Sequence, residues 1–404
     1  MRFSWKRLGS FGLIVCALST SAFSQTSFQF LEQPGHYPVG IRVVDQYDRS
    51  RTFPAPSAEA GRASAKKNPR PLQTLIWYPA SRVGLRPMNV GDYAGLFATE
   101  TSFDAPAQTN RWRTLLDTSL SVSMRAYRNA PPADGHFPVV IYAPGQSSVA
   151  WDNADLCEYL ASHGYVVIAS PSLGTNTHEV DDSVVDIDTE ARDISFLVSY
   201  ARTLPYADAT GTAVMGWSWG GIANLFAASR DHRISALVAF DGSMRYYPGF
   251  VKSAGVQPDR MTQPLLFFTQ GDISLEDQEK FLNEPANHGP NVLNEWRNGD
   301  LLTVHMLGMA HPDFASMYQR KESEDHFKSN QVADYGRGDV NSSYAWVARY
   351  TLMFLDTYLK RDLKAAAFLK KGPAENGVPK HLMAVSFRPS EKAPPSSTSH
   401  TPSH

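Results

Sequence analysis

The chain has 404 residues, of which 42% are hydrophobic, 19% charged and 11% aromatic, with 27 glycines and 27 prolines. This composition is typical of a globular protein with a large core and excludes disorder, collagen and coiled coil as the main state of the chain. The 38 basic and 40 acidic side chains leave a formal net charge of −2. Such a balance gives no overall field that would draw the chain onto nucleic acid or an anionic membrane, and it favours a neutral small-molecule or polymer substrate.

Residues 1–24 have the three parts of a secretory signal peptide. A basic start precedes an apolar stretch over residues 11–18, and a small-x-small cleavage site ends at Ser24. An uncleaved anchor is the weaker alternative, because the apolar stretch falls short of the roughly 20 residues that span a bilayer. We therefore expect a secreted or periplasmic protein without integral membrane association. Cleavage leaves Cys157 as the one cysteine of the mature chain, which excludes an intrachain disulfide.

Between residues 25 and 388, apolar runs of strand length alternate with helical patterns. Some runs, such as residues 139–143, are apolar at every position, as expected for strands buried on both faces of a parallel sheet. The alternation predicts a single α/β domain with a doubly wound, mostly parallel sheet and helices on both faces. Strands are expected at 39–44, 72–78, 139–143, 165–169, 213–215, 234–240, 264–269 and 302–306, and helices around 154–160, 187–204, 222–228 and 344–359.

Two segments fall outside this alternation. Residues 81–135 show no clean period, and we expect an insertion or cap over one end of the sheet, where substrate selectivity often resides. Residues 389–404 are rich in Pro, Ser, Thr and Lys and almost lack large apolar side chains, which predicts a disordered tail.

The chemistry is expected to centre on Ser218. It lies in the sequence Gly-Trp-Ser-Trp-Gly-Gly at residues 216–221, between a short apolar strand and the helix-forming residues 222–228. This is the pattern of a nucleophile elbow, in which a strained strand-to-helix turn exposes the serine hydroxyl at a helix N-terminus. The alternative is a glycine-rich turn with an inert serine, but that reading leaves the flanking strand and helix unexplained.

A serine hydroxyl becomes a good nucleophile only when a base takes its proton, and imidazole is suited to this near neutral pH. Behind a nucleophile elbow of this kind, the base lies on a loop after the last strand. His311 follows the strand that contains Val304 and is the candidate base. His305 lies within that strand and is expected to pack or hydrogen-bond, whereas His326 lies in a charged stretch and is expected to be solvated.

Two aspartates could orient the imidazole. Asp241 follows the strand at 234–240, and Asp272 follows the strand at 264–269. Each ends a strand between the nucleophile and the base in the chain, so each could accept the imidazole N–H and stabilise the cation formed during attack. The aspartate that does not do so is expected to cap its own loop.

Two backbone N–H groups are predicted to form an oxyanion hole. One belongs to Trp219, at the start of the helix after the elbow, and the other to Gln146, in the turn that Gly145 allows after the strand at 139–143. Trp217 is predicted either to wall an acyl pocket or to pack beneath the elbow.

No metal or other cofactor is expected. Acidic residues cluster near His178, but their spacing matches no metal-ligand signature and instead suggests a solvated loop. Cys157 lies on an apolar helix face and is predicted to be a buried small side chain.

Several short segments carry a resemblance to a known family, at residues 38–40, 51–53, 70–72, 77–80, Gly145, 216–221, 240–242, 263–265 and 311–314. Through them, the chain from about residue 35 to residue 369 resembles α/β-hydrolases of the dienelactone hydrolase-like group, in particular the platelet-activating-factor acetylhydrolase branch. In that branch the acid follows the strand after the nucleophile helix, so the resemblance implies Asp241; many other α/β-hydrolases carry it one strand later, at Asp272 here. The chain departs from the branch in its long insertion and in its bulky Trp217 and Trp219.

Together these features predict a secreted serine hydrolase that cleaves small-molecule or lipid-like carboxylic esters through an acyl-enzyme. Ser218 would attack the carbonyl carbon, His311 would transfer the proton, and an aspartate would orient the imidazole. A peptidase or a cutinase-like polyester hydrolase with the same three residues is the alternative, followed by a noncatalytic α/β-hydrolase-fold binding protein.

Overall fold

The computed structural model describes residues 27–54, 67–83, 86–271, 290–321 and 335–391. The predicted signal peptide, Asp272, His326 and residues 392–404 of the predicted tail lie outside the described residues. Among the described residues, no helix combines the length and the apolar character needed to cross a membrane.

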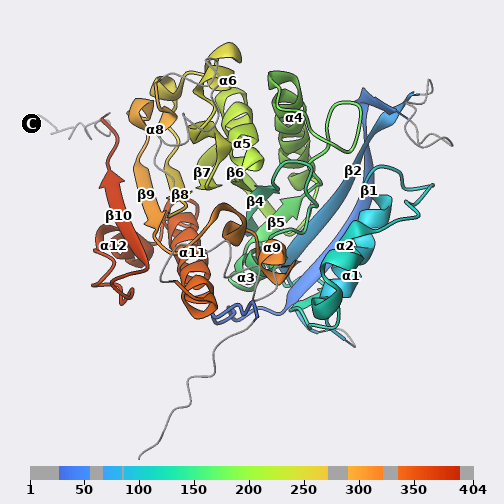
Figure 1. Cartoon of the computed structure of the whole chain (residues 1–404), viewed down its shortest axis with the longest axis horizontal. Coiled ribbons are helices and arrows are strands. Elements are labelled where there is room, and N and C mark those ends of the chain that lie inside the picture. The colour runs from blue at the N-terminus through green and yellow to red at the C-terminus, as the bar shows by residue number, and fades with distance from the viewer. Residues whose placement is uncertain (1–26, 55–66, 84–85, 272–289, 322–334, 392–404) are drawn as a thin grey trace, which may run out of the picture.

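A ten-stranded sheet runs through the molecule in the order β10-β9-β8-β7-β6-β4-β5-β2-β1-β3 (Figure 1). The central strands from β5 to β9 pair in parallel, whereas β1 with β2, β2 with β5 and β9 with β10 pair antiparallel. The strands are β1 (Val39–Pro54), β2 (Lys67–Pro79), β3 (Ala126–Arg128), β4 (Phe137–Ala143), β5 (Val166–Ala169), β6 (Ala207–Trp217), β7 (Ile234–Phe240), β8 (Leu265–Thr269), β9 (Leu301–Met306) and β10 (Met383–Arg388).

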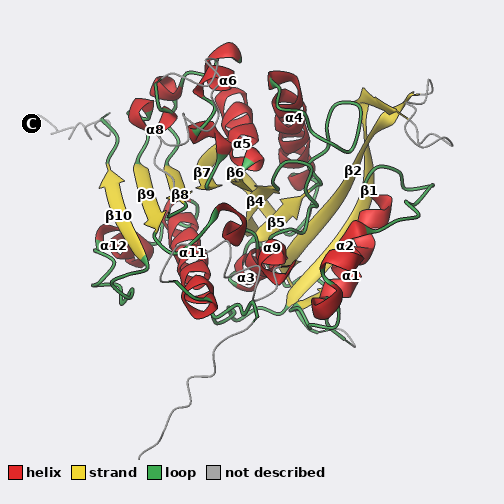
Figure 2. Cartoon of the chain, viewed as in Figure 1, coloured by secondary structure: helices red, strands yellow, loops and turns green. Residues whose placement is uncertain are grey.

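Helices cover both faces of this sheet (Figure 2). One core layer contains side chains of α3 and α11, and the other contains side chains of α4 and α5. The helices are α1 (Val90–Leu96), α2 (Arg111–Leu115), α3 (Ala154–Ser162), α4 (Val184–Ala201), α5 (Trp219–Arg230), α6 (Pro248–Ser253), α8 (Val292–Glu295), α9 (Ser316–Lys321), α11 (Arg337–Tyr358) and α12 (Leu363–Lys370). Short 3₁₀ turns include η3 (Ser243–Arg245) and η6 (His311–Phe314).

The two core layers explain the continuous apolar runs of the central strands. In β4, Val140 faces the α3 and α11 layer, whereas Val139 and Ile141 face the α4 and α5 layer, and all three are fully buried. Successive residues of a strand point to opposite faces, so a strand covered on both sides must be apolar at every position. The predicted doubly wound α/β fold is therefore confirmed.

The insertion at residues 81–135 contributes more to the sheet than expected. It contains α1 and α2, and its end forms β3, which pairs in parallel with β1 at the sheet edge. Tyr93 of α1 accepts a hydrogen bond from Trp77 of β2 and donates one to Glu158 of α3. The segment thus extends the sheet and packs over its α3 face.

The strand β10 is absent from the predicted elements. It pairs antiparallel with β9, so that Met383 lies opposite Met306, at the far edge of the sheet from β1 (Figure 1). Beyond β10, the backbone N–H of Ser390 donates to Asp300 and that of Glu391 donates to the Arg297 carbonyl. The chain therefore stays attached to the loop before β9 as far as residue 391.

A buried ion pair links two of the segments, 51–53 and 70–72, on which the predicted resemblance is based. The Arg70 guanidinium is 1% exposed and lies 2.6 Å from an Asp193 carboxylate oxygen, and Arg51 contacts the other oxygen at 2.5 Å. Arg70 also donates to the carbonyls of Leu173 and Gly174. These contacts join the β1–β2 pair to α4 and to the loop after β5, and removing one partner would leave a buried charge unpaired.

Candidate active site

The predicted elbow forms a tight turn between β6 and α5. Ser218 has φ +54° and ψ −117°, a left-handed conformation that is rare for a residue with a side chain. The turn packs directly on the end of β4: a Cβ on Gly220 would lie 2.2 Å from the Ala143 carbonyl oxygen. Only glycine fits at position 220, and the half-buried Ser218 hydroxyl is left facing the His311 loop.

Three of the predicted side chains form a hydrogen-bonded chain. His311 Nε2 lies 2.8 Å from Ser218 Oγ, and His311 Nδ1 lies 2.6 Å from Asp241 Oδ2. Asp241 is fully buried, whereas the His311 side chain is 34% exposed. The imidazole therefore lies between a buried carboxylate and an accessible hydroxyl, which is the arrangement that lets a histidine remove a serine proton.

The second oxygen of Asp241 is held by neighbours that the sequence analysis did not identify. The Tyr246 hydroxyl donates to Oδ1 at 2.6 Å, and the Gln270 N–H donates to the same oxygen at 3.4 Å. Burial and the Asp241 charge raise the pKa of the Tyr246 hydroxyl, so this hydroxyl stays a donor at neutral pH. Oδ2 is consequently oriented towards the imidazole.

The loop that carries His311 is fixed from two sides. Gln270 Oε1 accepts the His311 N–H at 3.1 Å, and the indole Nε1 of Trp217 donates to the His311 carbonyl oxygen at 2.9 Å. Trp217 is 5% exposed, and its ring centroid lies 4.8 Å from that of Tyr318. Of the two predicted roles of Trp217, these contacts describe packing beneath the site, and a role as an acyl-pocket wall stays a prediction.

The turn after β4 lies against the elbow. The Gly145 carbonyl accepts the Ser148 N–H, and Ser147 adopts φ +53°. Gln146 is exposed, and its side-chain amide donates to Asp182 and to the Val180 carbonyl. These contacts anchor the Gln146 side chain on the loop that contains Val180 and Asp182. The oxyanion role of the Gln146 backbone N–H stays a prediction.

The Trp219 side chain packs away from this turn. Its ring meets those of Tyr247 and Phe250 edge-on at 5.7 and 6.3 Å. As the first residue of α5, Trp219 has a backbone N–H among those that lack an acceptor within the helix. This N–H therefore remains a candidate oxyanion donor.

A buried carboxylate supports the turn from below. Asp152 is 0% exposed and accepts hydrogen bonds from the Gly145 N–H at 3.2 Å and from the Tyr142 hydroxyl at 2.5 Å. Burial raises the pKa of Asp152 to about 7. Its own carbonyl oxygen accepts the Met317 N–H of α9, so Asp152 links the turn after β4 to the helix that follows His311.

A cavity of about 410 Å³ adjoins Gln146. Trp112 and Leu115 of α2 form one wall, and Tyr318 of α9 forms another. Arg111, Glu179 and Lys321 add charged groups to the lining. The insertion thus supplies one side of a cavity next to the predicted oxyanion donor, where a substrate group can lie.

The remaining candidates lie elsewhere. His305 is exposed on β9, with Nε2 3.3 Å from the Gly271 carbonyl oxygen, and Asp272 lies outside the described residues. Cys157 is fully buried, as predicted, and burial raises the pKa of its thiol well above the usual value. His178 lies between Glu100 and Glu179, and no group of three or more His, Cys, Asp or Glu side chains in the described part of the chain is arranged to hold a metal.

The sequence carries a signal for the role of Gln270 beside Asp241 but none for that of Tyr246. Gln270 follows the last residue of β8, a position where polar side chains gather at the carboxyl edge of a parallel sheet. Tyr246 lies five residues after Asp241 in a segment without a periodic pattern, so its contact with the carboxylate depends on the fold of η3.

Comparison with known proteins places the chain among esterase-like proteins. A family model for chlorophyllases matches residues 116–263, which include Ser218 and Asp241 but not His311. A protein of Arthroderma benhamiae named as a 1-alkyl-2-acetylglycerophosphocholine esterase is 23% identical over 289 residues, covering 63% of this chain and 69% of that protein. A protein of Methylorubrum extorquens named as a carboxymethylenebutenolidase is 27% identical over 130 residues, covering 30% of this chain and 45% of that protein.

The fold matches a solved esterase over most of its length. The structure of a ferulic acid esterase from Streptomyces cinnamoneus superimposes with a TM-score of 0.59 and 17% identity, covering 89% of this chain and 98% of that one. At this level of identity, the superposition shows a shared fold.

Proposed function

We propose that this chain, an esterase-type α/β-hydrolase similar to dienelactone hydrolase-like and platelet-activating-factor acetylhydrolase-like proteins, cleaves carboxylic esters through an acyl-enzyme on Ser218. The single observation that carries the proposal is the chain of contacts from Ser218 Oγ to His311 at 2.8 Å and from His311 to the buried Asp241 at 2.6 Å. Such a chain activates a hydroxyl that is otherwise a poor nucleophile.

In the proposed acylation step, Ser218 Oγ attacks the ester carbonyl carbon while its proton passes to His311 Nε2. Asp241 stabilises the resulting imidazolium through Nδ1–H. The carbonyl oxygen becomes an oxyanion, for which the backbone N–H groups of Gln146 and Trp219 are the proposed donors. The intermediate then collapses: the C–O bond to the alcohol breaks, and the alkoxide leaves with the proton from His311 Nε2.

Deacylation repeats the sequence with water as the nucleophile. His311 Nε2 takes a proton from the water as its oxygen attacks the acyl carbon, and the same proton returns to Ser218 Oγ when the acid departs. The imidazole is about one-third exposed and is therefore accessible to this water. Every proton transferred stays between Ser218, His311, the alcohol and water.

We further propose a small-molecule or lipid-like ester as the substrate. The cavity beside Gln146 has apolar walls at Leu115 and Tyr318 and lies within the size range of small-ligand sites. Two of the similar proteins are named as esterases, one of an acetylated glycerophospholipid and one of ferulic acid esters. These names support a carboxylic ester, and not a peptide, as the substrate.

We also propose that the enzyme acts outside the cytoplasm after cleavage behind Ser24, on the basis of the pattern of residues 1–24. N-terminal sequencing of the protein from the periplasm or medium is expected to begin at Gln25. Recovery of the full-length chain from the cell membrane would contradict this.

The test of the catalytic proposal is Ser218→Ala in the mature chain, assayed on p-nitrophenyl acetate and butyrate. Loss of the nucleophile is expected to lower kcat/KM by roughly 10⁴-fold or more. Ser253→Ala, at an exposed position on α6, is the matched control and is expected to retain activity. Labelling by a fluorophosphonate probe should occur in the control and not in Ser218→Ala; hydrolysis or labelling that survives in Ser218→Ala contradicts the proposal.

A further inference from the structure

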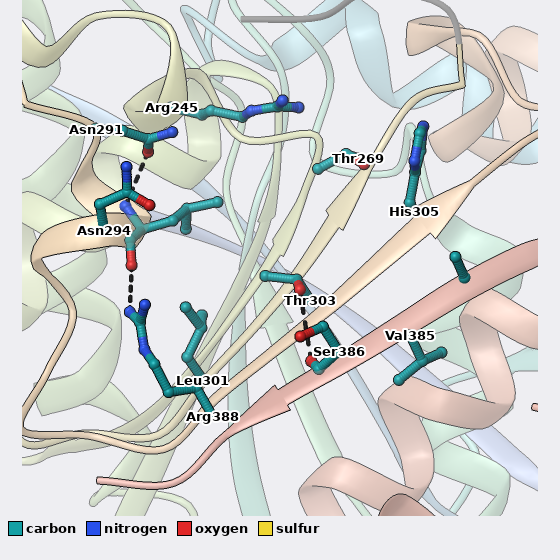
Figure 3. A pocket seen from close by; sticks show the side chains of 12 residues that line it. Arg245, Thr269, Asn291, Asn294, Leu301, Thr303, His305, Val385, Ser386 and Arg388 are labelled. Atoms are coloured by element: carbon teal, nitrogen blue, oxygen red, sulfur yellow. Dashed lines mark hydrogen bonds between the residues drawn. The ribbon is translucent and has the colours of Figure 1, made fainter. Parts of the chain in front are cut away.

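A second cavity, of about 450 Å³, is lined by residues of β8, β9 and β10 (Figure 3). These strands lie at the other end of the sheet from the insertion (Figure 1). The floor of the cavity is formed by β8, β9 and β10, where Thr269 pairs with His305 and Thr303 pairs with Ser386. Paired residues of neighbouring strands, and residues two apart on one strand, project from the same face. The hydroxyls and the imidazole therefore share one surface, which we call the β10 cleft.

The walls of the β10 cleft bring positive charge to this polar floor. Arg245 of η3 reaches over the cleft in the direction of Thr269 and His305, and Arg388 of β10 lies at the opposite end (Figure 3). Asn291 and Asn294 add amide groups from the region of α8. No acidic side chain occurs among the described residues that line the cleft. Two guanidinium groups thus line this cavity, and the described part of its lining supplies no carboxylate to balance them.

Neither Arg245 nor Arg388 forms an ion pair with another residue in the described part of the chain. Arg388 donates from Nη2 to the carbonyls of Trp296 and Leu293, and its Nε is buried without a hydrogen-bond acceptor among the described residues. The Arg245 guanidinium lies 5.4 Å from the Tyr246 ring centroid. Among the described residues, the contacts of both groups are thus with carbonyls and an aromatic ring, and none of these contacts supplies a negative charge.

We infer that the β10 cleft binds a small organic anion with clustered oxygens, of the phosphate-ester or polycarboxylate class. Guanidinium groups donate paired hydrogen bonds to such oxygens, and the threonine and serine hydroxyls and asparagine amides can donate to the oxygens that remain. The cavity volume fits a ligand of this size. The cavity beside Gln146 differs, because Glu179 is part of its lining.

The β10 cleft is lined by residues next in sequence to those that hold Asp241, the proposed catalytic acid, and Ser218 is not part of its lining. Arg245 is followed by Tyr246, which donates to Asp241, and Thr269 is followed by Gln270, which contacts both Asp241 and His311. An anion bound in the cleft would therefore touch the two segments that hold the catalytic acid and base. Binding itself does not depend on the proposed esterase activity, so the two proposals fail or succeed separately.

The experiment is isothermal titration calorimetry of the mature chain with inorganic phosphate and with citrate, at a constant ionic strength set by sodium chloride. Saturable binding is expected for at least one of the two anions. Arg245→Gln is expected to weaken it by roughly tenfold or more, because one charge-assisted contact is lost. Arg202→Gln removes the same charge from an exposed position at the end of α4 and is expected to leave the affinity unchanged.

His305→Gln is the second variant, because it changes the cleft floor at an exposed position without removing an arginine. This variant is expected to weaken binding of the same anion. In the unsubstituted chain, tighter binding of phosphate than of citrate indicates the phosphate-ester class, and the reverse order indicates the polycarboxylate class. Absence of saturable binding for both anions overturns the inference. Binding that is equally strong in Arg245→Gln, His305→Gln and Arg202→Gln also overturns it, because the anion would then lie elsewhere.

Discussion

Replacing Asp241 by asparagine tests how the buried carboxylate controls His311. The Tyr246 hydroxyl and the Gln270 N–H both donate to Oδ1, so an asparagine is expected to keep its carbonyl oxygen on that side. Its NH₂ group then faces His311 Nδ1, which lies 2.6 Å from Oδ2 in the native chain. Nδ1 must become an acceptor, and the imidazole proton moves to Nε2.

A proton on Nε2 leaves no lone pair for the Ser218 hydroxyl at 2.8 Å. Both the general base and the charge that stabilises the imidazolium are lost, and the rate is expected to fall by about 10³- to 10⁴-fold. At roughly 1.4 kcal/mol for each factor of ten, this is about 4 to 5.5 kcal/mol of transition-state stabilisation. The fold should survive, because Asp241 has φ +44° and asparagine accepts this left-handed conformation well.

The assay is kcat/KM on p-nitrophenyl butyrate, with circular dichroism and thermal unfolding to verify the fold. Tyr246→Phe is the matched control: it removes one donor from Oδ1 but keeps the Asp241 carboxylate, so its cost should be about tenfold. Asp272→Asn is expected to cost far less than Asp241→Asn. If Asp272→Asn proved the more damaging change, the acid would have to be reassigned and the proposed role of Asp241 would be wrong.

Two further predictions concern stability. In Gly145→Ala the new Cβ would lie 2.6 Å from the Trp217 ring, so we expect the free energy of unfolding measured in urea to fall by about 1–3 kcal/mol. Gly95→Ala is the control, because its Cβ would meet only the end of the Arg113 side chain. Equal stability of the two variants would contradict the reasoning. Burial raises the pKa of Glu190 from its ordinary value of 4.5 to about 8. The folded state therefore holds a proton that the unfolded chain releases, and stability falls as the pH rises from about 5 to 8. Glu190→Gln should flatten this fall by up to about 1.4 kcal/mol per pH unit, and parallel stability curves for the two proteins would rule the effect out.

The parts of the fold that the sequence could predict are those fixed by local pattern. The run at 139–143 is apolar throughout because β4 is covered on both faces, and the glycines around Ser218 are required by the elbow itself. The edge strand β10 carries no such pattern, since Met383 is the one buried residue of the strand and a polar segment follows it. The helices α1 and α2 are too short to establish a helical period.

The sequence was enough to single out Ser218 and His311 as the candidate nucleophile and base, but it did not reveal the geometry around the candidate acid. Asp241 and Asp272 both end strands, and only the three-dimensional position of the imidazole places Asp241 against Nδ1. Tyr246 and Gln270 come from segments after two different strands, and their hydrogen bonds depend on how those segments fold over the sheet edge. Such contacts between distant residues leave no periodic signal in the chain.

The contacts of Trp217 hold three segments in place relative to one another: the elbow, the turn after β4 and the loop that carries His311. Its ring occupies the space that a side chain at position 145 would need, and its indole N–H donates to the His311 carbonyl. Gly145 in turn donates its N–H to Asp152, so the ring is packed against a turn that is itself anchored. A smaller residue before the nucleophile would open a gap between the turn and the His311 loop and would leave that carbonyl without its donor. The bulky Trp217 side chain is therefore a positioning element that contacts both the turn after β4 and the His311 loop.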